Sequence, residues 1–115
     1  MIDVATFRGF LREVHRTLNT ELSPWEHVLV GALGLAGEAG EVADLVKKAT
    51  TRQVRDITLL TEEQRVQIAE ELGDLLWYIA LLVEVFGWSF TSLMQMNVRK
   101  LQQRFPNGWQ EVEGH

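Results

Sequence analysis

The stretch Gly37-Glu38-Ala39-Gly40-Glu41 and a second stretch, Glu71-Leu72-Gly73-Asp74, decide how this 115-residue sequence is interpreted. Apart from the two glutamates of the first stretch, residues 28–43 carry no charge, and Asp74 is the one charge within residues 72–83. Carboxylates spaced i, i+3 share one face of a helix, where they repel each other. A hard divalent cation such as Mg²⁺ would reverse that repulsion by binding their oxygen atoms. The alternative is that these are ordinary amphipathic helices with acidic rims. That alternative explains a single acidic pair well, but it explains two such pairs less well.

The composition fits one soluble domain over residues 1–115, with a loose tail expected at 107–115. Apolar residues make up 46% of the chain and charged residues 23%. A net charge of −5 argues against binding duplex nucleic acid, whose phosphates need a basic surface. The longest apolar run, residues 75–83, is shorter than the roughly 20 residues that span a membrane. With no cysteine and no signal-peptide pattern, we expect a cytoplasmic protein without disulfides.

Helical periodicity and capping signals predict an all-α fold, a bundle of four to five helices. The expected helices cover residues 4–18, 24–48, 62–86 and 90–105, joined in part by a loop at 49–60. The first is expected to be capped by Asp3, the second by Ser23, the third by Thr61 and the fourth by Ser89. Gly87 is expected to end the third helix.

Regular apolar stripes predict which helix faces are packed. The third helix carries a seam spaced 4-3-4-3-4 with the acidic pair beside it: Ile68, Leu72, Leu75, Ile79, Leu82 and Phe86. The fourth helix carries a core stripe: Phe90, Met94, Val98, Leu101 and Phe105. Glycine inside a helix costs about 1 kcal/mol relative to alanine. We therefore expect the glycines of the second and third helices to permit close approach of another helix: Gly31, Gly34, Gly37, Gly40 and Gly73.

Over residues 22–106 the sequence resembles the MazG-like all-α nucleoside triphosphate pyrophosphohydrolases. The resemblance lies in Glu38-x-x-Glu41, Glu71-x-x-Asp74 and the later Asn97-x-x-Lys100-Leu101-x-x-Arg104-Phe105-Pro106. It implies hydrolysis of a ribo- or deoxynucleoside triphosphate between the α and β phosphates, giving the monophosphate and pyrophosphate. The 29 residues between the two acidic pairs are at the long end of the family pattern.

The resemblance also implies roles for individual residues, in agreement with their chemistry. The catalytic site would consist of four carboxylates that hold Mg²⁺, with Mn²⁺ as a substitute: Glu38, Glu41, Glu71 and Asp74. Glu41 or Glu38 would accept a proton from the attacking water. The phosphate-binding candidates are Asn97, Lys100, Arg104 and Lys48, for which a solvated basic face is the alternative. Candidates near the base are His15, Trp25 and Tyr78, for which ordinary packing is an equal alternative.

Three other functions fit parts of the same pattern. One is a sister activity on the same fold, the hydrolysis of dUTP or phosphoribosyl-ATP. Another is a non-catalytic helical interaction module. A ferritin-like di-iron bundle is the third, although it calls for Glu-x-x-His pairs that neither acidic pair supplies.

The chain is expected to form a homodimer or homotetramer. The second helix is apolar or small over nearly its whole circumference, and such a helix belongs in an interior. Four helices cannot enclose two of their own members, so a second copy should cover the surplus apolar surface. The family resemblance points the same way.

Overall fold

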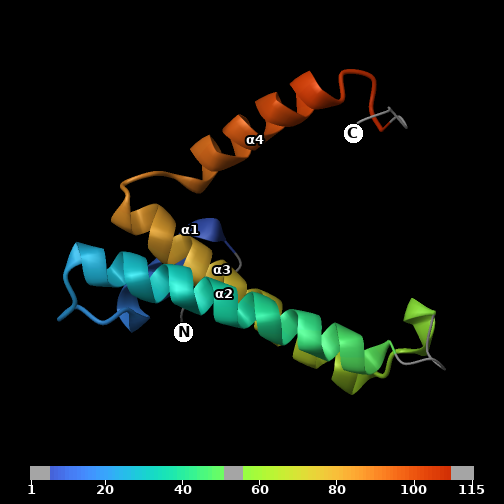
Figure 1. Cartoon of the computed structure of the whole chain (residues 1–115). Coiled ribbons are helices and arrows are strands. Elements are labelled where there is room, and N and C mark those ends of the chain that lie inside the picture. Colours follow the sequence, from blue (N-terminus) through green and yellow to red (C-terminus); the bar gives the residue numbers. More distant parts are fainter. Residues whose placement is uncertain (1–5, 51–55, 110–115) are drawn as a thin grey trace.

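The structure, a computed structural model, describes residues 6–50 and 56–109 and confirms the all-α class (Figure 1). Within those ranges there is no β-strand. The elements in order are α1 (Phe7–Thr17), α2 (Pro24–Ala49), the short 3-10 helix η1 (Ile57–Leu59), α3 (Glu62–Val85) and α4 (Phe90–Arg104). The predicted loop at 49–60 therefore contains η1, while residues 51–55 lie outside the described residues.

Side-chain capping sets where the helices begin. The predicted caps Ser23, Thr61 and Ser89 are confirmed, and each forms a reciprocal capping box with the residue three positions later. The predicted Asp3 cap is wrong, because α1 is capped by Thr6, whose hydroxyl oxygen accepts a hydrogen bond from the Gly9 amide at 3.1 Å. Asp3 itself lies outside the described residues.

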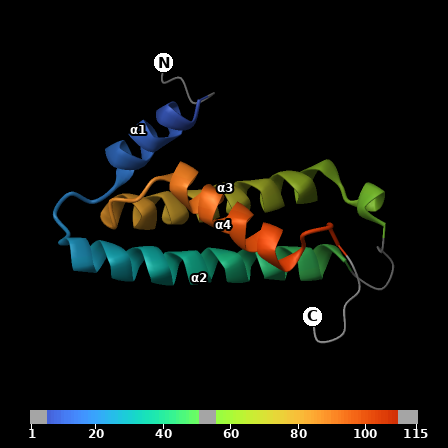
Figure 2. The same ribbon diagram turned by 90° about the horizontal axis from the view of Figure 1, so that it is seen from above.

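The fold is built on an antiparallel hairpin of α2 and α3, with α1 lying against the C-terminal half of α3 (Figure 2). Leu81 and Val14 are the largest fully buried side chains, and Ala80 and Val83 are also buried. The core therefore lies where all three helices meet.

The predicted seam of α3 is only partly right. Leu72 and Phe86 are exposed, whereas Ala80, Leu81 and Val83 are the most buried residues of the helix. The reason is that α1 covers only part of α3, so burial follows the position of α1 more than the heptad spacing.

Helix α4 leaves the hairpin at a sharp bend. The axes of α3 and α4 differ by 101°, and Gly87 between them has a φ of 70°, which favours glycine. Along its length α4 stands away from α2 and α3 (Figure 1), and it touches the fold at its first turn, where the Phe90 and Phe7 ring centroids are 4.5 Å apart. The predicted core stripe is therefore wrong within one chain, because three of its members are exposed: Met94 (56%), Val98 (49%) and Leu101 (46%).

The start of the C-terminal segment contacts the end of α4. Gly108 has a φ of 79° and donates its amide to the Phe105 carbonyl at 3.2 Å, and the Trp109 ring lies 5.9 Å from the Phe105 ring. Residues 107–109 thus fold back on the end of α4. Residues 110–115 lie outside the described residues, so the loose tail expected at 107–115 stays a prediction.

The glycines of the hairpin divide into two groups. A Cβ added at Gly34 would lie 2.2 Å from the Tyr78 ring, and one at Gly31 would lie 2.8 Å from the Leu82 side chain. The predicted close approach is confirmed at these two positions. It is wrong for Gly37, Gly40 and Gly73, which have no atom within 4 Å of such a Cβ, because no other part of the described chain covers them.

The single chain is open for its size. Its radius of gyration is 17.7 Å, whereas a compact domain of this length has about 13 Å. Its accessible surface is 9157 Å², whereas a compact protein of this mass exposes about 6,400 Å².

Of the described helices, none is by itself long and apolar enough to cross a membrane. Only α3 and α4 taken together reach that length and composition, and they form a bent pair.

Candidate functional site

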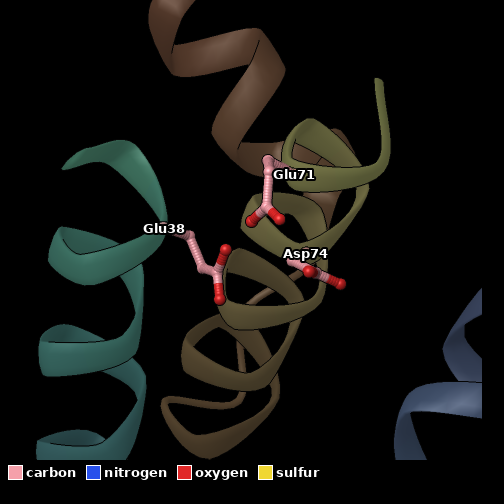
Figure 3. Close-up of side chains that lie close together, drawn as sticks. All are labelled: Glu38, Glu71 and Asp74. Carbon is pink, nitrogen blue, oxygen red and sulfur yellow. The ribbon is translucent and has the colours of Figure 1, made fainter. Parts of the chain in front are cut away.

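Three carboxylates from α2 and α3 meet in the middle of the hairpin. Glu38, Glu71 and Asp74 each offer an oxygen atom, and these atoms lie within 4.8 Å of one another. Figure 3 shows Glu38 reaching from α2 towards Glu71 on α3, with Asp74 one turn further along the same helix. Glu38 and Glu71 are half-buried and Asp74 is exposed. The antiparallel pairing of the helices thus joins the two acidic stretches of the sequence.

The carboxylates of this cluster lie close enough to repel one another. Oε2 of Glu38 and Oε2 of Glu71 are buried and have no hydrogen-bond partner. The Glu38 carboxylate raises the pKa of Glu71 above its ordinary value, with burial adding to the effect. The adjacent Glu71 in turn raises the pKa of Glu41, which is exposed and brings the fourth predicted carboxylate next to the cluster. The local field therefore favours bound positive charge.

The donor set fits a hard divalent cation. Buried carboxylate oxygens without partners are costly, and a cation that binds them removes both the repulsion and the unsatisfied acceptors. The grouped ligands are all carboxylates, which suit Mg²⁺ or Mn²⁺. The di-iron alternative is not supported, because no histidine belongs to this group.

A shallow hollow of about 330 Å³ adjoins the carboxylates and is lined by Glu38, Asp74, Trp77 and Tyr78. The Tyr78 ring occupies the space above Gly34, and the Trp77 ring meets it edge-on at a centroid distance of 5.2 Å. Tyr78, a predicted base contact, thus lies beside the acidic cluster. Trp77 was missed from the sequence, although its position three residues after Asp74 places it on the same helical face.

The other two predicted base contacts lie elsewhere. Trp25 is 67% exposed in the first turn of α2 and does not line the hollow. Nε2 of His15 lies 3.0 Å from Oε2 of Glu84. His15 borders a separate hollow of about 210 Å³. Neither residue is brought to the carboxylate cluster within one chain.

The predicted phosphate contacts also lie apart from the cluster. Lys48 forms an ion pair with Asp44 at 2.7 Å, and that carboxylate raises the pKa of Lys48. Asn97, Lys100 and Arg104 are exposed on α4, which stands away from the hairpin (Figure 1). One chain therefore assembles the acidic part of the site and an aromatic wall, without these basic side chains.

Fold and site together define a class: helical proteins with a cluster of carboxylates between two antiparallel helices. Comparison with known families narrows this class. The MazG nucleotide pyrophosphohydrolase domain matches residues 30–109, a range that includes both acidic pairs, and the chain belongs to this family.

Two relatives are similar over much of their length. The Gene 37 protein of Mycobacterium phage L5 is 40% identical over 77 residues, which cover 66% of this chain and 64% of the phage protein. The alignment thus spans just under two thirds of that relative. The uncharacterised protein YvdC of Bacillus subtilis (strain 168) is 33% identical over 88 residues, covering 75% of this chain and 79% of YvdC. No solved structure matches the chain.

Proposed function

We propose that this protein is a Mg²⁺-dependent pyrophosphohydrolase that cleaves ribo- or deoxynucleoside triphosphates between the α and β phosphates, releasing the monophosphate and pyrophosphate. The observation that carries the proposal is the group of three carboxylates, two with buried unpaired oxygens, in a chain of the MazG nucleotide pyrophosphohydrolase family. The hollow beside them offers space for part of a nucleotide.

Within this proposal the residues of the hairpin have separate tasks. Glu38, Glu71 and Asp74 would hold the metal. When bound, Mg²⁺ neutralises phosphate oxygens and lowers the pKa of water. Glu41 would accept the proton of the attacking water, since it lies next to Glu71 but is not one of the three grouped ligands. Tyr78, fixed above Gly34, would help to close the hollow around the nucleoside.

The proposal includes a homodimer or homotetramer. The chain exposes about 2,800 Å² more than a compact protein of its mass. For two chains the excess is about 5,600 Å², at the upper end of the total area that obligate homodimers bury. In such an assembly α4 would lay its apolar stripe on a second copy. Asn97, Lys100 and Arg104 would then approach the phosphates held at the other copy's acidic cluster. We expect the assembly to work in the cytoplasm.

The test is a pyrophosphate-release screen of the purified protein over all ribo- and deoxynucleoside triphosphates. The panel includes dUTP and phosphoribosyl-ATP, the substrates of the sister activities. We expect Mg²⁺-dependent release of pyrophosphate and monophosphate, abolished by EDTA, and a melting temperature that rises with Mg²⁺ or Mn²⁺. Release of the nucleoside diphosphate and inorganic phosphate would instead show that the bond between the β and γ phosphates is cleaved. No metal-dependent release from any substrate would favour the non-catalytic interaction module.

A further inference from the structure

We propose that Trp77 is the side chain on which the nucleoside of the substrate stacks, and that Thr17 of α1 holds Trp77 in place. The inference rests on the proposed function, which it extends to the part of the substrate remote from the phosphates. It also gives α1 a task, because this helix contributes no carboxylate to the cluster.

Trp77 lies in the right place to contact a nucleoside. It follows Asp74 by one helical turn and lines the same hollow as Asp74 and Glu38. Its ring is half-buried, so part of its surface is accessible from the hollow. A triphosphate held at the carboxylates would thus leave its sugar and base next to the indole.

The indole is held in one orientation by Thr17 of α1 and by Tyr78 of its own helix. Its Nε1 donates a hydrogen bond to Oγ1 of Thr17 at 2.8 Å. The Thr17 hydroxyl is itself fixed, because it donates to the backbone carbonyl of Glu13 at 2.7 Å and so keeps a lone pair for the indole. On its other side the ring meets Tyr78 edge-on, at an interplanar angle of 82°, and Tyr78 is lodged above Gly34 of α2. A ring ordered before binding loses little freedom when a base stacks on it.

The chemistry of the lining assigns this wall to the base and not to the phosphates. The residues that border the hollow are two acids and two aromatics, and no basic side chain is among them. Anionic phosphates would be held only on the metal-loaded carboxylates, which leaves the aromatic surface for a flat, uncharged ring. Every base has a π face, so stacking on Trp77 should contribute to purine and pyrimidine nucleotides alike.

The experiment compares two ligands in the presence of Mg²⁺: an α,β-methylene nucleoside triphosphate, which resists cleavage at that bond, and inorganic tripolyphosphate, which has no nucleoside. We expect Trp77→Ala to weaken nucleotide binding roughly tenfold to a hundredfold and to leave tripolyphosphate binding unchanged. Trp88→Ala is the matched control, because Trp88 stacks on Phe86 outside this hollow, and it should change neither affinity.

A second set of variants tests the role of Thr17 and guards against misfolding of Trp77→Ala. Thr17→Val keeps the shape but removes the acceptor, so it should weaken nucleotide binding, while Thr17→Ser should restore it. In the background of Trp77→Phe, which keeps an aromatic ring but has no N–H, Thr17→Val should have no further effect. A merely structural role of Thr17 would lower affinity in both backgrounds.

The failure of this inference is separable from that of the proposed function. Equal weakening of nucleotide and tripolyphosphate by Trp77→Ala, or no weakening of either, would overturn the assignment of Trp77 even if the wild type hydrolyses nucleotides. Absence of turnover in the wild type would overturn the proposed function, while a loss of affinity confined to the nucleotide would still support stacking on Trp77.

Discussion

Glu71 is the residue on which the acidic cluster depends most directly. Its carboxylate faces Glu38, raises the pKa of Glu41 and has one buried oxygen without a hydrogen-bond partner. Such an arrangement opposes folding when no cation is bound, since the like charges repel each other. A group that costs stability in the metal-free chain is best explained by a task in function.

Replacing this carboxylate should separate activity from stability. We expect Glu71→Gln to lower turnover more than roughly a hundredfold, because even residues that only support metal ligands are worth 10- to 100-fold. The metal-free melting temperature should stay equal or rise. Glu70→Gln, the same change at an exposed neighbouring position, is the control and should retain activity. Wild-type turnover by Glu71→Gln would remove the basis of the proposed site.

The raised pKa values of Glu41 and Glu71 predict how metal-free stability depends on pH. A carboxyl group whose folded-state pKa is raised contributes its full stability below the ordinary value of 4.5 and loses it as the pH rises through the folded pKa. The gain in metal-free stability of Glu71→Gln over the wild type should therefore be small near about pH 4 and grow towards about pH 7. Melting curves in EDTA measure it, and an advantage that shrinks as the pH rises would contradict the raised pKa of Glu71.

At the scale of the elements, the glycines of α2 offer a matched pair of substitutions. Gly37→Ala meets no neighbour within 4 Å and should raise the free energy of unfolding by about 0.5–1 kcal/mol, the gain of alanine over glycine in a helix. The methyl group of Gly34→Ala would collide with the Tyr78 ring, so this variant should lower the free energy of unfolding by about 1–3 kcal/mol. Urea titrations of both variants decide this. A loss of stability for Gly37→Ala would indicate that another chain packs against that position.

The helices and the acidic cluster could be predicted from the sequence because their determinants are local. Ser23 and Thr61 form the capping boxes expected from the residues that follow, and Ser89 caps α4 as expected. Carboxylates spaced i, i+3 come together once their two helices pack antiparallel, and the oxygen atoms of Glu38, Glu71 and Asp74 lie together in this way.

The arrangement of elements around the hairpin could not be predicted in the same way. Gly87 indicated where α3 ends, but its freedom of φ does not specify the 101° bend that exposes the stripe of α4. Thr17 and Trp77 are 60 positions apart, and nothing in the spacing of either residue points to the hydrogen bond between them. These features depend on how helices cross, which short motifs do not encode.

At the scale of the whole molecule, the exposed stripe of α4 predicts the mode of assembly. Light scattering at micromolar concentration should give two or four times the chain mass of 13.1 kDa. Val98→Glu, in the middle of the stripe, should shift the protein towards the single-chain mass, because a charge at a buried interface is costly. Gln103→Glu, exposed on the same helix but off the stripe, should not. A wild-type protein of single-chain mass would contradict the proposed assembly.

The separation of α4 from the hairpin also has a consequence for the order of events in refolding. Helices α1 to α3 form their buried core within one chain, so that step should be unimolecular, with a rate independent of protein concentration. The stripe of α4 has nothing to bury against until two chains collide. We therefore expect a second, slower phase whose rate falls about tenfold on tenfold dilution. Stopped-flow fluorescence would resolve both phases, and a single phase insensitive to dilution would mean that α4 finds its partner surface within its own chain.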